Sequence, residues 1–519
     1  MLHIVWFKRD LRIADHKPLT EALKTGEPVL LLYVFEPELW QQPDLSFRHH
    51  AFLVECLKSL NHHLKAQLTV KVGSVIDILT DIQQKNPNIT LWSHQETWNN
   101  WTYQRDKAVL QWTQKHIITW HEYVNFGVFR RLKNRDDWAL LWHQEMYAPI
   151  IETAPLKNIT QLPSDKMSDS SLFNLTHDGC QDLQRQKGGR AACLETFNSF
   201  LYKRGEGYTQ EMSSPVTAWQ ACSRISPYLA FGVLSMREAF QTALIRYDDL
   251  NALPYNITGH ITGKWKSALK SFLSRLRWHC HFIQKLEDEP EIEYSNMHIL
   301  YNGLRENDFN THYFNAFKAG KTGYPLIDAC MRALIATGWI NFRMRAMLMS
   351  FSAYHLWLHW QRPAHFLAQL FVDYEPGIHY SQAQMQSGTT GINAIRIYNP
   401  IKQSQDQDPE GIFIKQWIPE LVDMPTEFIH TPWEKPEYMH TYPMPIIDEK
   451  TARKAASDKI YALKKTLEHK AEAKNLFQKH GSRKTQSSQA RKSKKKSLPK
   501  KTIKKPISNS HPNQGTLLL

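Results

Sequence analysis

Residues 2–12 read LHIVWFKRDLR, a largely apolar run that passes directly into a cluster of charges. Short apolar runs bounded by polar turns are typical of β strands covered on both faces. The side chains of Lys8, Arg9, Asp10 and Arg12 then stand at the carboxyl end of this strand, the edge where ligands bind in parallel sheets. Because the same charges break the apolar run early, we expect no secretory signal.

The next 110 residues repeat this strand pattern, with further apolar runs at 29–35, 68–72, 89–92 and 117–121. Between them, residues 47–67 and 102–115 place apolar side chains at helical spacing. Repeated β-α-β units predict a doubly wound parallel sheet. No G-x-G-x-x-G motif follows the first strand, so we do not expect a dinucleotide-binding version of this fold.

The rest of the chain changes character twice. Residues 148–189 are polar and rich in Ser, Asp and Pro, which predicts a surface connector. Helical patterns then dominate from residue 190 onward, and residues 451–480 form a charged helical stretch. We predict four parts, namely an α/β domain at 1–130, an interdomain connector at 131–189, a mainly α-helical domain at 190–440 and a basic, disordered C-terminal segment at 441–519.

The positive charge is concentrated at the C-terminus. The chain carries a net +14, and residues 481–519 contain 11 Lys or Arg and no acid, which leaves about +3 (14 − 11) for the rest. Lysine clusters gain DNA affinity by releasing counterions, so a phosphate-binding arm is one interpretation. A solubilising terminus and, in a eukaryote, a nuclear-import signal are the others.

The cysteine pattern and the length of the apolar runs limit the cellular location that we expect. The six cysteines contain no C-x-x-C pair, which indicates reduced thiols and neither a metal site nor a metal cluster. The longest apolar run, 29–35, is too short to span a bilayer. We expect a soluble cytoplasmic protein with no membrane partner, associated with the nucleoid if bacterial. The 17 Trp indicate either core filling or stacking on flat rings.

Residues 223–235 read SRISPYLAFGVLS. Ser226 before Pro227 predicts the start of a helix. The hydroxyls of Ser223 and Ser226, together with the free amides of that terminus, would suit a diphosphate. An ordinary capped helix is the alternative.

Four further segments complete a pattern, namely WFKRDLR (6–12), GKTGYPLIDACMRALIATGW (320–339), RMR (343–345) and RIYNPIKQSQDQDPEGIFIKQWIPEL (396–421). In order and spacing, from residue 1 to about 440, these motifs resemble the photolyase/cryptochrome family. The resemblance implies an antenna domain followed by a helical FAD-binding domain. It also implies that light drives an electron from reduced flavin to a pyrimidine dimer in DNA.

The resemblance assigns the flavin contacts to Tyr208, Ser223, Arg224, Ile225, Ser226, Arg345, Asp373, Tyr374 and Glu375. A guanidinium at Arg345, paired with Asp373, would stabilise an anionic reduced flavin. Glu375 stands where the family has a second aspartate.

The substrate cleft and the ring-facing helix depart from the family. Trp278 matches a tryptophan that stacks on the flipped dimer, with a core aromatic as the alternative. Arg275 replaces a glutamate that binds the pyrimidine, and it could hold a carbonyl or a phosphate instead. Phe342 replaces an asparagine. His279 and His281 invite comparison with the branch that repairs (6-4) lesions.

His379 stands where the family has an asparagine that faces flavin N5, and it could donate a hydrogen bond or a proton there. A packing or capping histidine is the alternative. The three-tryptophan electron route is broken, because its outer positions are Ala383 and Phe317 and only Trp360 survives. Another route could use the aromatic residues Trp339, Trp357, Tyr380 or Tyr398.

Glu96 matches a carboxylate that binds a pterin-type antenna, so a second chromophore of folate or deazaflavin type is predicted. The leading hypothesis is a monomeric deoxyribodipyrimidine photolyase that splits cyclobutane dimers in DNA. The alternatives are a cryptochrome-like photoreceptor with a signalling tail, (6-4) repair, and a DNA-binding flavoprotein without repair activity.

Overall fold

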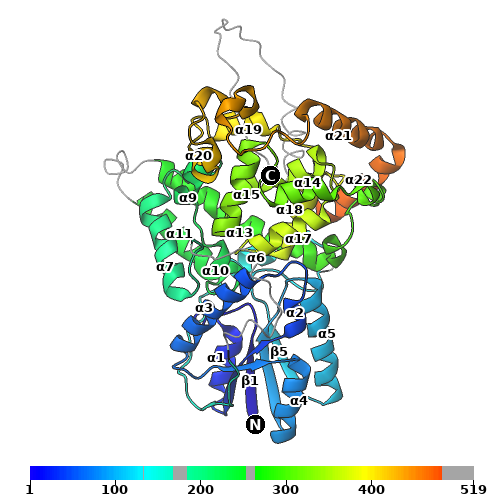
Figure 1. The fold of residues 1–519 in the computed structure, drawn as a ribbon. Coiled ribbons are helices and arrows are strands. Elements are labelled where there is room, and N and C mark those ends of the chain that lie inside the picture. The colour runs from blue at the N-terminus through cyan, green and yellow to red at the C-terminus, as the bar shows by residue number, and fades with distance from the viewer. Residues whose placement is uncertain (133, 167–183, 253–262, 482–519) are drawn as a thin grey trace, which may run out of the picture.

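The computed structural model describes residues 1–132, 134–166, 184–252 and 263–481 (Figure 1). An α/β domain forms one end of the molecule and a larger helical domain forms the other. Within the described residues, no helix is both long and apolar enough to cross a membrane.

The sheet of the α/β domain is parallel throughout. Its strands are β1 (Leu2–Phe7), β2 (Val29–Phe35), β3 (Thr69–Val72), β4 (Ile89–His94), β5 (Thr119–Tyr123) and β6 (Ile159–Thr160). The order is β3-β2-β1-β4-β5, and β6 pairs with the first residues of β2. The predicted doubly wound sheet is confirmed. Because the order reverses between β1 and β4, the crevice for ligands lies at the carboxyl ends of these two strands.

Alternating side chains of the strands enter two cores. Ile4 and Trp6 of β1 face one core, and Val5 and Phe7 face the other. The helices of this domain are α1 (Lys17–Lys24), α2 (Pro37–Trp40), α3 (Phe47–His63), α4 (Val75–Lys85) and α5 (Asn100–Lys115). The core on the Val5 and Phe7 side continues without a break into the helical domain, so one face of the sheet positions that domain.

The second domain is helical, as predicted. Its helices are α7 (Arg190–Ser199), α8 (Tyr208–Glu211), α9 (Pro215–Ala221), α10 (Ser226–Ala230), α11 (Met236–Ala252), α13 (Gly263–Asp288), α14 (Thr311–Lys318), α15 (Pro325–Thr337), α16 (Phe342–Ser350), α17 (Gln361–Leu370), α18 (Pro376–Ser387), α19 (Pro400–Gln407) and α20 (Ile412–Trp417). The long helix α13 packs against both α18 and α11.

The segment predicted as a connector is only partly one. Helix α6 (Trp138–Tyr147) packs against α11 and buries Trp138, Trp142 and Met146. Farther along, β6 joins the sheet, and the amide of Asp165 donates to Val70 O at 2.9 Å. Residues 131–166 therefore include core elements. Residues 167–183 lie outside the described part of the chain.

The predicted boundary at residue 440 is too early. Helices α21 (Glu449–Lys464) and α22 (Leu467–His480) follow it. Ala456 and Ile460, one helical turn apart, are buried together with Tyr301 and Tyr354. His480 hydrogen-bonds to Glu289, just beyond α13, and Lys479 forms an ion pair with the same carboxylate at 3.0 Å. A narrow apolar stripe thus anchors this charged stretch to the helical domain. The disorder predicted for the tail concerns residues 482–519, outside the described residues.

The loop after β1 is docked on the loop after α10. Arg9 Nε donates to Ala230 O at 2.8 Å, and Arg12 Nη1 donates to Gly232 O at 3.1 Å. Gly232 has a φ of +64°, and a Cβ added there would lie 2.1 Å from Arg9 O. The contact between the domains therefore requires glycine at this position, both for its conformation and for space.

We expect Gly232→Ala to destabilise the protein by roughly 3 kcal/mol or more, because strain and a backbone clash add. Gly26→Ala is the matched control, since Gly26 has a φ of +73° and nothing within 4 Å of an added Cβ. That control should cost only about 1 kcal/mol. Thermal unfolding measures both variants. Equal losses would show that the contact between Gly232 and Arg9 does not hold the domains together.

Candidate functional site

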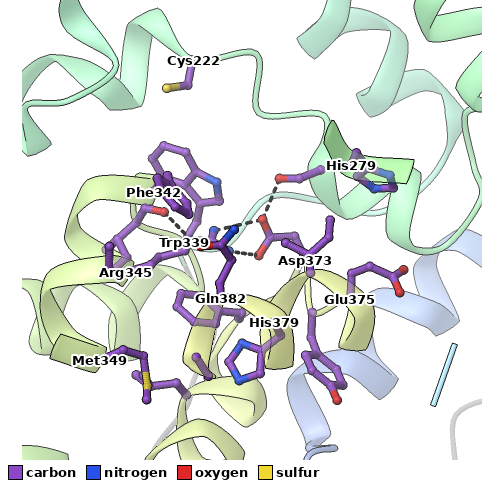
Figure 2. Close-up of a pocket in the computed structure, with 18 of the residues that line it drawn as sticks. Cys222, His279, Trp339, Phe342, Arg345, Met349, Asp373, Glu375, His379 and Gln382 are labelled. Atoms are coloured by element: carbon purple, nitrogen blue, oxygen red, sulfur yellow. Dashed lines mark hydrogen bonds and ion pairs between the residues drawn. The ribbon is translucent and has the colours of Figure 1, made fainter. Parts of the chain in front are cut away.

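A cavity opens in the helical domain between α16, α18 and the loop before α10 (Figure 2). Its volume is about 1170 Å³ with the solvent at the mouth included. Ten of the predicted site residues line it, namely Tyr208, Ser223, Arg224, Ser226, Phe342, Arg345, Asp373, Tyr374, Glu375 and His379.

An ion pair lies at the centre of the wall. Arg345 Nη1 and Nη2 donate to the two oxygens of Asp373 at 3.0 and 2.9 Å, which is the bidentate geometry of a strong pair. Ser226 Oγ also donates to Asp373 Oδ2, at 2.7 Å (Figure 2). Ser226 is the first residue of α10, and no side chain caps that helix. Ser226 therefore orients the carboxylate instead of marking a capped helix start.

Arg224 is a buried cation, and none of the described residues offers it a carboxylate within ion-pair distance. Its guanidinium lies 3.4 Å from the ring centroid of Trp219 and 4.1 Å from that of Trp339. The Nε and Nη2 atoms are buried and have no hydrogen-bond partner. Burial, reinforced by Arg204, lowers the pKa of Arg224 to about 9. A stacked guanidinium with unused donors on a cavity wall is suited to an anion.

Glu375 places a carboxyl on the same cavity. Its Oε1 is buried without a partner. Burial raises the pKa of Glu375 to about 8, although Arg9 of the N-terminal domain opposes the shift. The carboxyl is therefore mostly protonated at neutral pH, and it can donate a hydrogen bond as well as accept one.

His379 has a neutral ring, and one of its nitrogens contacts a backbone carbonyl. Its Nε2 lies 2.8 Å from Ala364 O. Because a carbonyl only accepts, Nε2 carries the proton and Nδ1 keeps its lone pair. Burial lowers the pKa of His379 to about 4, so the ring stays uncharged at neutral pH.

The structure places Trp278 away from this cavity. Trp278 lines a separate pocket together with Trp138 and Trp142 of α6. The two histidines of α13 that suggested (6-4) repair lie in different pockets. His279 lines the first cavity, and His281 lies beside Trp278, with ring centroids 5.0 Å apart. The side chain of Trp278, which was predicted to stack on a flipped dimer, therefore faces α6 and does not line the cavity.

Three further predicted residues support the cavity without lining it. Ile225 is buried in the core beneath α10. Trp360 is fully buried, and its Nε1 donates to Asn296 Oδ1 at 2.8 Å. Arg275 lies beside Met212, with Nη2 and Sδ 4.0 Å apart.

Sequence reasoning missed much of the lining, including Trp339, Met349, Ile378, Gln382 and Gln386. For α18, the spacing of residues in the sequence could have predicted part of this lining. Residues 375, 378, 379, 382 and 386 repeat at helical spacing, so they share one face of α18. Once His379 was placed, Gln382 and Gln386 could have been inferred.

Glu96 lies in the N-terminal domain, at the carboxyl end of β4. Its Oε2 accepts a hydrogen bond from Arg105 Nη2 at 2.5 Å. A small pocket beside it is lined by Trp6, Trp40 and Trp98. The aromatic lining suits a planar ligand, and a second chromophore here stays a prediction.

Comparison with known proteins matches this arrangement. Residues 3–128 match the DNA photolyase family, and residues 272–462 match the FAD binding domain of DNA photolyase. A deoxyribodipyrimidine photo-lyase of Vibrio cholerae is 27% identical over 485 residues, covering 87% of this chain and 97% of that protein. A cryptochrome DASH of Gloeobacter violaceus is 24% identical over 504 residues, covering 88% and 95%.

The fold agrees as well. The crystal structure of a class III photolyase from Agrobacterium tumefaciens superposes with a TM-score of 0.75 at 24% identity, covering 89% of this chain and 98% of that one. The chain therefore belongs to the photolyase/cryptochrome family, and its helical domain is an FAD-binding domain.

Proposed function

We propose that the protein is a light-dependent DNA-repair enzyme, a deoxyribodipyrimidine photolyase that splits cyclobutane pyrimidine dimers. The observation that carries the proposal is the cavity, which joins a buried anion-binding guanidinium at Arg224 to the Arg345–Asp373 pair. Curated relatives named deoxyribodipyrimidine photo-lyase match over nearly their whole length, which supports the same activity.

The lining fits FAD. The unused donors of Arg224 and the hydroxyl of Ser223 would hold the diphosphate. The Arg345–Asp373 pair, Glu375 and His379 would surround the ring system. When reduced FAD is bound, light allows it to lend one electron to the dimer and to recover that electron after the cyclobutane ring opens.

The residues have distinct tasks in this reaction. Arg345 offers positive charge where the ring becomes electron-rich, and Asp373 keeps that cation oriented. His379 offers the lone pair of Nδ1, and Glu375 offers a hydrogen that is lost as pH rises through about 8. The apolar walls at Leu367 and Phe371 exclude water.

The mouth of the cavity is suited to DNA. Phe342 begins α16 and is 40% exposed, although it is a large apolar side chain that lines the cavity. An exposed ring at the mouth can stack on a base that has left the duplex. In this proposal Phe342, and not Trp278, contacts the lesion, and Arg275 supports Tyr208 from behind.

A cryptochrome-like photoreceptor is the second candidate. The similarity to a protein named cryptochrome DASH over 88% of the chain favours it. Under this hypothesis light changes the exposure of residues 482–519. Limited proteolysis of illuminated and dark protein tests it, and identical cleavage of that segment in both samples would rule it out.

We expect purified, reduced protein under blue light to remove cyclobutane dimers from an oligonucleotide, with no loss in the dark. Chromatography of the digested DNA measures the lesion. A parallel substrate that carries the (6-4) lesion tests that alternative, since His279 lines the cavity. Loss of the (6-4) lesion alone would transfer the proposal to that substrate. Loss of neither lesion would refute the repair function.

We expect Glu375→Gln to stabilise the flavoprotein, and increasingly so as pH rises. The pKa of this carboxyl rises on folding from 4.5 to about 8, so the charged form costs stability progressively across that interval. Glutamine removes the cost, and the gain should reach roughly 4 kcal/mol near pH 8. Thermal melts from pH 5 to about pH 9 measure it. The exposed Glu437 provides the control variant Glu437→Gln, and the same trend in both variants would contradict the assignment.

We expect removal of residues 482–519 to weaken binding to undamaged DNA and to flatten its salt dependence. This segment holds the 11 cations counted above, and the slope of log K against log salt becomes shallower by about 0.9 for every phosphate that the protein no longer neutralises. A protein in which a Gly/Ser segment of equal length replaces these residues controls for chain length. An unchanged slope would show that the tail does not bind phosphate.

A further inference from the structure

A buried carboxylate of the N-terminal domain receives two tyrosine hydroxyls of the helical domain. Asp44 lies between α2 and α3 and is 2% exposed. Its Oδ2 accepts from Tyr374, which precedes α18, and also from Tyr380 within α18, the latter at 3.1 Å. Its Oδ1 is buried, and no described residue hydrogen-bonds to it. The carboxylate therefore has an unused oxygen.

The two tyrosines connect the flavin cavity to the tryptophan that survives from the family's electron route. Tyr374 lines the cavity. Its ring centroid is 6.3 Å from that of Tyr380, which is 6.2 Å from that of Trp360. Ala383, at the position of the missing proximal tryptophan, offers no oxidisable ring. Within the described residues, Tyr374 and Tyr380 thus supply consecutive oxidisable rings from the cavity to Trp360.

A phenol can act as an electron donor only if its proton has a destination. Burial, with the charge of Asp44 as the next cause, raises the pKa of both tyrosines well above the usual value, so both start as neutral phenols. A phenol that loses an electron becomes a strong acid, and a carboxylate already hydrogen-bonded to it can take the proton without rearrangement. Trp360 lacks this advantage, because its N–H donates to the side-chain amide oxygen of Asn296, a poor base.

We propose that the Tyr374–Asp44–Tyr380 cluster replaces the broken tryptophan route and reduces the photoexcited oxidised flavin by coupled transfer of an electron and a proton. This inference rests on the proposed function. Tyr374 gives one electron to the flavin, its O–H bond breaks, and the proton passes to Asp44. Tyr380 then gives an electron to the Tyr374 radical, Asp44 returns its proton to the oxygen of Tyr374, and Asp44 takes the proton that Tyr380 loses. An external thiol gives the electron that restores Tyr380, Asp44 returns the proton to it, and the oxidised thiol ends as a disulfide. Asp44 acts as a positioning residue and proton acceptor, and it does not contact the flavin.

The experiment follows photoreduction of the oxidised flavoprotein by absorbance, under blue light and with dithiothreitol, in H₂O and in D₂O. Tyr374→Phe and Asp44→Asn should each slow the reaction about tenfold or more and remove the solvent isotope effect. Tyr380→Phe should slow it less, and Trp360→Phe should keep the isotope effect. Freeze-quenched wild-type protein should show a tyrosyl radical by electron paramagnetic resonance, which Tyr374→Phe abolishes.

Tyr442→Phe is the matched control. Tyr442 is a buried tyrosine whose hydroxyl donates to a carboxylate oxygen of Asp328 at 2.6 Å, and it does not line the cavity. This variant loses the same kind of interaction, so its photoreduction rate and radical signal should match those of the wild type. The bound FAD of every variant is quantified first, and rates are expressed per flavin.

Two results would overturn the proposal. One is a wild-type rate with an unchanged isotope effect in both Tyr374→Phe and Asp44→Asn. The other is loss of photoreduction in Trp360→Phe together with a tryptophan radical in place of a tyrosyl radical. Failure of the repair function is distinguishable, because the repair assay starts from chemically reduced protein and does not need this cluster. If the wild type photoreduces through Tyr374 but repairs no lesion, the role of the cluster is supported and the proposed repair activity is refuted.

Discussion

The arrangement of the cavity depends on one buried guanidinium, that of Arg48 in the first turn of α3. It donates to Leu334 O at 3.0 Å and to Leu370 O at 2.6 Å. These carbonyls belong to the C-terminal ends of α15 and α17, where a cation also opposes the negative end of the helix dipole. The chain leaving α15 carries Trp339, and the chain leaving α17 carries Asp373. A side chain of the N-terminal domain thus fixes the spacing of two cavity walls.

The loop after β1 makes a second link between the domains, and its charges hold it rigid. Asp10 Oδ2 lies 2.9 Å from His16 Nε2 and 2.7 Å from His94 Nδ1. Although burial opposes the charge, these imidazoles keep the pKa of Asp10 well below its usual range. Both oxygens of Asp10 are thus hydrogen-bonded, since Oδ1 accepts from the amide of Lys8. The fixed loop presents Arg9, whose charge limits the rise in the pKa of Glu375. The α/β domain therefore tunes the flavin cavity electrostatically as well as by packing.

Local pattern was enough to predict the strands, because apolar runs report on local structure. The Arg345–Asp373 pair was predicted only through the family resemblance, since the two residues lie 28 positions apart. Prediction from local pattern failed where contacts between distant residues determine the orientation or the protonation of a side chain. The orientation of Trp278 depends on how α13 turns between two pockets, and the tautomer of His379 depends on Ala364 O, fifteen residues away. Asp44 carried no signal, since its tyrosine partners lie more than 300 residues further along the chain. The helical stretch after residue 450 was predicted, but its packing on the helical domain was not, because its few buried side chains, such as Ala456, Ile460 and Leu476, are scattered among charges.

Buried polar atoms without partners lie on the wall of the flavin cavity, and they explain why a cofactor belongs there. The donors of Arg224, the Oε1 of Glu375 and the Nδ1 of His279 are all unsatisfied. Each such atom costs about 1–3 kcal/mol, so native proteins retain few of them without a purpose. The set suits an anion beside Arg224 and a polar ring beside Glu375 and His279, and FAD offers both groups. Because the ligand binds only the folded domain, its affinity adds directly to the stability of that domain. The hydrogen bonds of Arg48 and the packing of α13 against α18 hold the other walls in place. The cavity is therefore formed by the protein alone, and FAD satisfies the polar atoms that line it.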